Sequence, residues 1–145
     1  MRLNEPVTQR EVLFDPEEAL ISKTDLKGVI TYANDAFIRV SGYHQGELLG
    51  QPHNLMRHPD MPPEAFKDLW KTIQTGRPWT GIIKNRCKNG DHYWVDAYVT
   101  PVYSNGQLSG YQSVRTAPKR DAVEKADALY RDLREKRITK LPKHT

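Results

Sequence analysis

The stretch from Trp79 to Thr116, WTGIIKNRCKNGDHYWVDAYVTPVYSNGQLSGYQSVRT, decides the fold of this chain. Two Asn-Gly pairs, Asn89-Gly90 and Asn105-Gly106, interrupt runs that are rich in β-branched and aromatic residues. Asn-Gly is the strongest short-range hairpin signal because both residues tolerate the positive φ angles of a type I′ turn. The stretch therefore predicts an antiparallel meander. Its three strands are predicted over Trp79–Arg86, His92–Val99 and Leu108–Thr116.

A shorter hairpin and several helical turns precede the meander. Leu20–Thr24 and Val29–Ala33 are β-type runs, and Asp25–Gly28 between them begins and ends with residues typical of tight turns. Asn34–Gly42 then begins with a helix-capping residue and ends with glycine, which predicts a short helix. Residues 43–60 are interrupted by glycine and proline, so they predict short helical turns joined by loops.

A clearer helix begins at Pro62-Pro63 and ends before Gly76. Its apolar side chains recur at the i, i+3, i+4 and i+7 spacing of one helix face. These side chains are Phe66, Leu69, Trp70 and Ile73. Two strands, then helices, then three strands along the chain predict an α+β fold.

The segments that flank this core differ from it in composition. Residues 1–19 are polar and contain two prolines, which predicts an N-terminal arm, and residues 20–117 form the predicted domain. Residues 118–145 predict an amphipathic helix followed by a basic tail. The apolar face of this helix consists of Val123, Ala126, Tyr130 and Leu133. It is too short for a coiled coil, and it can dock on its own sheet or pair with a second copy.

The composition excludes several classes of protein. A length of 145 residues with 37% hydrophobic residues fits one domain with a single core. No window approaches the ~18 apolar residues that span a bilayer, and Met1 to Arg10 lack a secretory apolar region. The single cysteine, Cys87, excludes a disulfide framework and a multi-thiolate metal site. These features predict a cytoplasmic location.

The net charge of +4 belongs to the C-terminal segment. Residues 118–145 contain 9 Lys+Arg and 5 Asp+Glu, whereas residues 1–117 contain 13 of each. The predicted domain is therefore neutral, and the basic residues near the C-terminus alternate too loosely with others to form a nucleic-acid motif. Nucleic acid is not a predicted partner.

Alternation along the strand Trp79–Arg86 places one amide among apolar side chains. One face carries Trp79, Gly81, Ile83 and Asn85. The other face, predicted to meet water, carries Thr80, Ile82, Lys84 and Arg86. A buried amide must be hydrogen-bonded, so Asn85 requires a partner inside the fold. Gly81 leaves room beside Trp79 for a group that approaches the strand.

The loop Pro52–Asp60 contains two histidines, an arginine and an aspartate within nine residues. His53 and His58 are candidate ligands of a metal or of haem iron. A histidine with Asp60 is a candidate acid–base pair, although no Ser or Cys nucleophile signature lies nearby. Arg57 and His58 suit an anionic group such as a phosphate. The residues alone leave these chemistries open, together with a plain surface loop.

Two sets of motifs point to a family. The general set is Asn34-Asp35-Ala36-Phe37, Ser41-Gly42-Tyr43 and Gly110-Tyr111. The more specific set is Gly50–Asn54, Arg57–Pro62, Pro78-Trp79, and Lys84–Arg86 with Lys88–Trp94. The chain resembles a PAS sensor domain, and the second set closely resembles the FAD-binding PAS domain of bacterial aerotaxis receptors over residues 20–117. This resemblance implies a five-stranded antiparallel sheet with short helices on one face, enclosing a cofactor pocket.

The resemblance also implies which residues bind the cofactor. Its motifs mark as candidate FAD-pocket residues Asn34, His53, Arg57, His58, Asp60, Trp70, Trp79 and Asn85. Asn85 suits the polar edge of a flavin and Trp79 offers a flat wall. Arg57 and His58 suit the pyrophosphate or the adenosine end of FAD. No metal site is predicted.

A departure from the light-sensing PAS domains of the LOV type is also informative. Those domains place a photoreactive cysteine after a Gly-x-Asn motif on a short helix. The matching stretch here is Gly50–His53, with His53 in the position of that cysteine, while Cys87 lies at a strand end. We therefore expect no cysteinyl-flavin photocycle.

The predicted function is a redox- or oxygen-responsive signalling sensor that binds FAD non-covalently and is not an enzyme. The alternatives are a haem PAS domain, with His53 or His58 as axial ligand, and a cofactor-free interaction module. Aerotaxis receptors continue into a membrane anchor, a HAMP region and a methyl-accepting-type domain, whereas this chain ends at Thr145. We expect either a fragment of such a receptor or a small protein that acts by association. The expected partners are a HAMP or chemoreceptor-type domain and a second copy.

Overall fold

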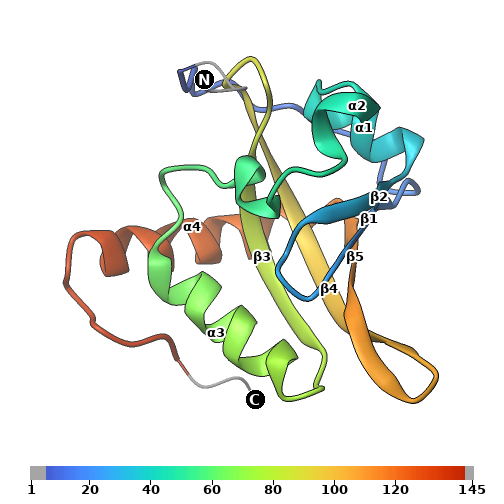
Figure 1. Ribbon diagram of the computed structural model, residues 1–145. Helices are drawn as coiled ribbons and strands as arrows, with labels where there is room; N and C mark the ends of the chain where they lie inside the picture. The colour runs from blue at the N-terminus through green and yellow to red at the C-terminus, as the bar shows by residue number, and fades with distance from the viewer. Residues whose placement is uncertain (1–5, 143–145) are drawn as a thin grey trace.

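A five-stranded antiparallel sheet forms the centre of the molecule (Figure 1). The computed structural model describes residues 6–142. The strands lie in the order β2-β1-β5-β4-β3, which confirms the predicted α+β fold with a PAS-type sheet. The elements are, in chain order, β1 (Leu20–Thr24), β2 (Ile30–Ala33), α1 (Asp35–Ser41), α2 (Gln45–Leu48), the 3-10 helix η1 (His53–Met56), α3 (Pro63–Gln74), β3 (Trp79–Arg86), β4 (His92–Ser104), β5 (Gln107–Thr116) and α4 (Arg120–Arg134).

The two Asn-Gly pairs of the meander form different connections. Asn105-Gly106 is a two-residue turn in which both φ angles are positive, 52° and 77°, as a type I′ turn requires. Asn89-Gly90 lies inside the longer connection Cys87–Asp91, where Gly90 has a φ of 92°. β4 continues to Ser104, five residues beyond the predicted end, because it pairs with β5 as far as the turn.

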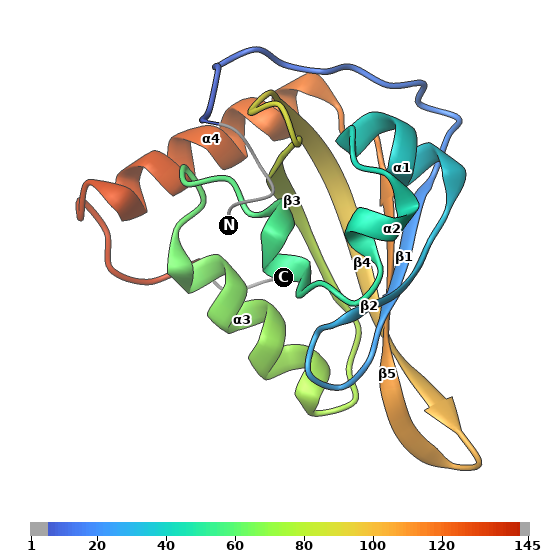
Figure 2. The same cartoon turned by 45° about the horizontal axis from the view of Figure 1, so that its top comes forward.

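The helical elements α1, α2, η1 and α3 lie on one side of the sheet (Figure 2). α1 begins at Asp35 because Asn34 Oδ1 accepts a hydrogen bond from Phe37 N at 3.0 Å. The Asn34 side chain also accepts from Ile21 N at 3.0 Å and donates to Ala19 O at 2.9 Å. Asn34 therefore caps the helix and joins it to the start of β1.

α4 packs against the edge strand β3, and the apolar face predicted for it is buried. The Tyr130 hydroxyl donates a hydrogen bond to the carbonyl of Ile82. The prediction that Lys84 faces water is wrong, because this residue is only 6% exposed. Its ammonium pairs with Asp60 at 2.8 Å and lies 5.8 Å from the centre of the Trp94 ring. No helix within residues 6–142 has the length and apolar character needed to cross a bilayer.

The described part of the N-terminal arm is docked along the start of β4. β5 pairs with β4 only from Asp96 onward, so the backbone of His92 is available on that side. Val12 N donates to His92 O at 2.7 Å, and His92 N donates to Arg10 O at 2.8 Å. An ion pair of 2.9 Å between Glu11 and Arg120 also joins the arm to α4. The outermost residues of the predicted arm and tail, 1–5 and 143–145, lie outside the described residues.

Candidate functional site

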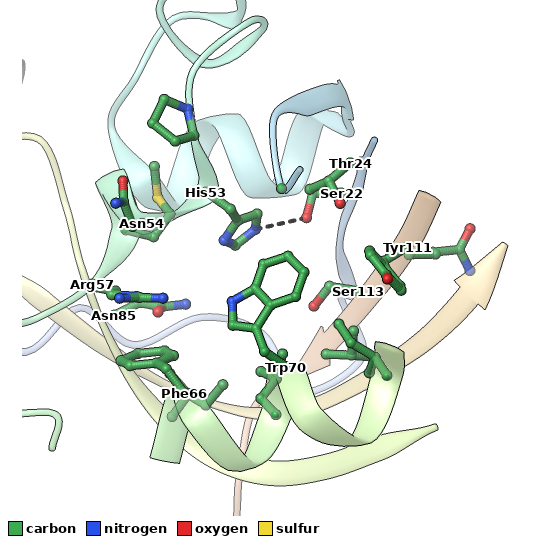
Figure 3. A pocket seen from close by; sticks show the side chains of 18 of the residues that line it. Ser22, Thr24, His53, Asn54, Arg57, Phe66, Trp70, Asn85, Tyr111 and Ser113 are labelled. Atoms are coloured by element: carbon green, nitrogen blue, oxygen red, sulfur yellow. Dashed lines mark hydrogen bonds between the residues drawn. The ribbon is translucent and has the colours of Figure 1, made fainter. Parts of the chain in front are cut away.

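A cavity of about 330 Å³ lies between the sheet and the η1–α3 layer (Figure 3). Its volume falls within the ~300–1,000 Å³ that is usual for small-molecule and cofactor sites. Most of the surface that its wall exposes is apolar, although polar residues are well represented in it. The polar and charged lining residues are Ser22, Thr24, Lys27, His53, Asn54, Arg57, Asn85, Tyr111, Gln112, Ser113 and Arg115. None of the lining residues is Asp or Glu.

Arg115 is a buried cation in this wall, and it has no carboxylate partner among the described residues. It is 2% exposed. Its guanidinium donates to Leu20 O at 3.0 Å and to Ser22 Oγ, and it lies 4.4 Å from the centre of the Phe37 ring. Burial lowers the pKa of Arg115 to about 10. Because a buried charge is costly without a counter-charge, this arrangement is suited to an anionic or strongly hydrogen-bond-accepting ligand.

His53 is held beside Arg115 as a neutral ring. Its Nε2 lies 3.0 Å from Arg115 Nη2 and 3.1 Å from Ser22 Oγ. Burial, followed by the charge of Arg115, lowers the pKa of His53 to about 3. Since a guanidinium can only donate, Nε2 of His53 accepts, and the ring proton is assigned to Nδ1. Stacking of His53 on Phe37, with ring centres 6.3 Å apart, fixes the ring orientation.

Arg57 and Asn85 meet where the loop after η1 joins the edge of β3. Their backbones form an isolated antiparallel bridge. Asn85 is buried on the inner face of the strand, as alternation predicted, and lines the cavity. Arg57 is an exposed residue, and its guanidinium lies 4.0 Å from the centre of the Phe66 ring. The two residues thus present an amide to the interior and a cation to the rim.

Trp70 projects from α3 across the cavity toward the first hairpin (Figure 3). Its ring meets Tyr111 edge to face, with centres 5.6 Å apart. A Cβ atom at Gly28 would lie 3.1 Å from the indole, so glycine allows the turn to approach Trp70 closely. The indole therefore forms an aromatic wall between α3 and the turn.

Four of the eight predicted pocket residues line the cavity, and four lie elsewhere. Those in the wall are His53, Arg57, Trp70 and Asn85. Outside the wall are Asn34, His58, Asp60 and Trp79. Asn34 caps α1, as described above. Trp79 packs over Gly81 and donates from Nε1 to Asp68 of α3 at 2.7 Å, which explains the glycine on that strand face.

His58 and Asp60 belong to a polar cluster beside the cavity. Asp60 pairs with Lys84, while His58 Nδ1 accepts from Asp60 N at 3.0 Å. The His58 ring is 1% exposed and meets His92 edge to face at 5.8 Å. Burial, followed by the charges of Lys84, lowers the pKa of His58 to about 4, with Asp60 acting in the opposite direction. This cluster links the loop to β3 and β4.

Sequence reasoning missed several polar lining residues, and the most buried cation among them is Arg115. Tyr111, Ser113 and Arg115 alternate along β5 and pair with inner-face residues of β4, so all three line the cavity. The same alternation that identified Asn85 could have identified a cation on an inner face. Sequence alone could not show that Ser22 and His53, from other elements, converge on that cation.

The arrangement does not favour metal or thiol chemistry. Within residues 6–142, no three His, Cys, Asp or Glu side chains gather as a metal site. Cys87 is buried at the end of β3, and burial raises its pKa to about 12. The thiolate needed for nucleophilic chemistry is therefore suppressed. The cavity is a candidate binding site, with polar groups from β1, η1, β3 and β5 in its wall.

The chain belongs to the PAS-fold family, whose profile matches residues 30–115. Over 134 residues it is 49% identical to an aerotaxis receptor of Escherichia coli (strain K12), which confirms the predicted resemblance to the sensor domain of aerotaxis receptors. The match covers 92% of this chain and 26% of that receptor. A nitrogen fixation regulatory protein of Klebsiella pneumoniae is 38% identical over 96 residues, 66% of this chain and 19% of its own length.

Solved structures support the fold independently. The structure titled "Flavin Analogue Sheds Light on Light-Oxygen-Voltage Domain Mechanism" matches with a TM-score of 0.65 and 22% identity over 81% of this chain and 87% of that chain. The light-state Aureochrome1 LOV structure matches with a TM-score of 0.64 and 20% identity, covering 85% and 93%. At these identities the likeness defines the fold alone. The relatives by sequence define this chain as a signalling sensor domain of the PAS type.

Proposed function

We propose that this domain is a redox- or oxygen-responsive sensor that binds FAD non-covalently in the cavity. The observation that carries the proposal is the burial of the Arg115 guanidinium in a wall that contains no Asp or Glu. Within residues 6–142, this guanidinium has no carboxylate partner. The resemblance to the FAD-binding PAS domain of aerotaxis receptors supports it too, as does a similar structure whose title names a flavin analogue. The domain would act in signalling and would not catalyse turnover of a substrate.

The cavity residues fit a flavin. Asn85 and Arg115 would hold the polar edge of the ring, because an amide both donates and accepts and a guanidinium donates. Trp70 and Tyr111 would contact its flat faces. Arg57 at the rim would hold the dinucleotide part. A bound flavin would supply reversible electron transfer, and the protein residues would bind it and orient it.

The four predicted residues outside the wall would act indirectly. Asn34 and Trp79 hold α1 and α3 to the sheet, and they would keep the cavity open at a fixed width. His58 and Asp60 would fix the loop that carries Arg57. We therefore propose that these residues support FAD binding through the frame of the cavity.

An absorption spectrum of the purified protein tests the proposal directly. Flavin bands released as FAD by denaturation are the expected result. A haem Soret band would instead favour the haem alternative, and a spectrum without either chromophore, before and after incubation with FAD, would favour a cofactor-free module. No observation favours haem over FAD, because His53 Nε2 already meets Arg115 and Ser22 and because His58 lies outside the wall.

Replacement of Arg57 by Ala is expected to weaken FAD by about tenfold but riboflavin by less than about twofold. The physical reason is that Arg57 lies at the exposed rim, where the charged dinucleotide of FAD would leave the cavity. Titration of the ligand-free protein with each flavin measures the difference. Arg39→Ala, an exposed arginine paired with Glu18 outside the cavity, is the matched control. Equal losses for both flavins would contradict the assignment.

The signal is proposed to travel along β3. This strand carries Asn85 toward the cavity, and the carbonyl of Ile82 accepts from Tyr130 of α4. The amide of Asn85 can rotate when hydrogen bonding at the flavin edge changes with redox state. In the cytoplasm, the partner of this domain would be a HAMP or chemoreceptor-type domain, or a second copy of the chain. This chain spans about a quarter of the E. coli aerotaxis receptor, so the signalling output of the whole protein is likewise something we propose.

Reduction of bound FAD is expected to change hydrogen-exchange protection in the terminal segments. The arm docks on β4 through the bridge of Glu11 to His92, and α4 docks on β3 through contacts that include the Tyr130 hydrogen bond, so a shift of β3 and β4 would alter their docking. Exchange is measured on oxidised and reduced protein, with α1, which is not part of the proposed route, as internal control. Identical protection in both states across residues 6–19 and 118–140 would reject this route.

A further inference from the structure

The cations of the cavity wall fall into one deep group and a rim. Arg115 is deep, whereas Lys27 and Arg57 are both exposed residues that still line the cavity. Within residues 6–142, neither Lys27 nor Arg57 forms an ion pair. The rim therefore carries two cations that form no ion pair within the described residues.

The turn of the first hairpin fixes where Lys27 stands. Asp25 Oδ1 accepts from the backbone N of Lys27 at 2.9 Å and from that of Val29 at 3.0 Å. The next residue, Gly28, has a φ of 85° and packs against Trp70, and its carbonyl accepts from His53 N at 2.9 Å. The backbone of Lys27 is thus held between the turn and the cavity wall, while its side chain is free to reach the entrance.

Lys27 differs in this respect from the other lysines near it in the chain and in the fold. Lys23, in the same hairpin, lies 5.7 Å from the centre of the Tyr32 ring and does not line the cavity. Lys84 and Lys88 are paired with Asp60 and Glu47. Of these four lysines, Lys27 alone lines the cavity, and it forms no ion pair with a described residue.

We propose that Lys27 is a further cofactor-binding residue, which contacts the diphosphate of FAD from the hairpin side of the entrance while Arg57 contacts it from the η1 side. This inference rests on the proposed function and adds a residue to it. An ammonium is a compact charge on a flexible stem, so it can follow a phosphate without demanding one geometry. At an exposed rim such a contact is screened by water and salt, and its effect depends on ionic strength.

The test compares Lys27→Gln with Lys23→Gln in the full chain, using FAD and riboflavin as probes. At low ionic strength Lys27→Gln is expected to weaken FAD by about three- to tenfold, and this loss should shrink toward unity in ~0.5 M salt. Riboflavin, which has no phosphate, should bind Lys27→Gln as it binds the wild type. Lys23→Gln should match the wild type with both flavins.

Two results would overturn the inference without touching the proposed function. One is unchanged FAD affinity in Lys27→Gln at low salt, and the other is an equal loss for FAD and riboflavin. A wild-type protein that binds neither flavin would overturn the proposed function and this inference together. The double variant Lys27→Gln/Arg57→Gln adds an independent readout, because two residues that share one diphosphate should show non-additive losses.

Discussion

Replacement of Arg115 by Met is expected to lower the affinity for FAD by about 10- to 100-fold while the free energy of unfolding of the ligand-free protein changes by no more than about 1 kcal/mol. The two effects differ in size because the guanidinium is expected to contribute more to ligand binding than to the stability of the ligand-free fold. Without a ligand, its charge is buried beside the neutral His53 and has no described carboxylate partner. Removing that charge relieves its desolvation.

The relief is offset by contacts that the substitution removes. The carbonyl of Leu20 loses this donor, and Phe37 loses the cation above its ring. Ser22 Oγ and His53 Nε2 also lose the guanidinium, but they can still hydrogen-bond to each other across 3.1 Å. An orphaned buried acceptor costs about 1–3 kcal/mol, which is similar to what removal of an unpaired buried charge returns. Methionine has a comparable length and no charge, so it fills the space that alanine would leave empty. The ligand has no such compensation and loses a charge-assisted hydrogen bond.

Denaturant unfolding of the ligand-free protein and flavin titration measure the two sides of this prediction. Arg115→Lys keeps the charge but not the planar fork of donors, so an intermediate affinity is expected. Arg120→Met, which removes an exposed arginine paired with Glu11 on the arm, is the control for loss of positive charge. Full FAD affinity in Arg115→Met, combined with a loss of more than about 3 kcal/mol of stability, would make Arg115 a structural residue instead.

Acidification from pH 7 to pH 4.5 is expected to destabilise the protein by about 2 kcal/mol through His58 alone. The pKa of His58 is lowered to about 4 in the folded state, against an ordinary value of 6.5. The unfolded chain therefore binds the proton first as the pH falls. The stabilisation is fully present above pH 6.5 and is lost progressively toward pH 4. His53, whose pKa is lowered to about 3, extends the loss further into acid.

The variant His58→Gln isolates this contribution. A glutamine oxygen can accept from the backbone N of Asp60, as His58 Nδ1 does, but it does not titrate. We expect the unfolding free energy of the wild type to fall more steeply between pH 6.5 and 4.5 than that of the variant. Urea unfolding at several pH values, without flavin, provides the measurement. Parallel pH curves for the two proteins would show that His58 protonates freely in the fold.

Local chemistry was sufficient to predict the order and type of the elements. Asn34 and Gly42 delimit α1, Pro63 opens α3, and Asn105-Gly106 makes the predicted two-residue turn. These signals act through backbone conformation and hydrogen bonds within a few residues, so they are readable without knowledge of the rest of the chain. Alternation along Trp79–Arg86 likewise placed Asn85 on the cavity side.

Long-range packing decided the other features. Alternation predicts that Lys84 faces water, yet this residue is buried and pairs with Asp60. A helix more than thirty residues further along the chain docks on the same strand. Trp79 is predicted to line the cavity, yet its indole packs over Gly81 and donates to Asp68 of α3. Neither contact can be predicted from the residues next to Lys84 or Trp79 in the chain.

By itself, then, the sequence determined the five strands, the helices between them and the PAS-type motifs, because each depends on turn, cap and alternation signals that neighbouring residues carry. Only the tertiary structure decided which polar groups face the cavity. Arg115, Ser22 and His53 come from β5, β1 and η1, and they meet because the sheet places β1 beside β5 and the helical layer closes over both. The effect of a buried charge on binding and stability depends on the groups that contact it. Packing brings those groups together from parts of the chain that are too far apart for any local pattern to link them.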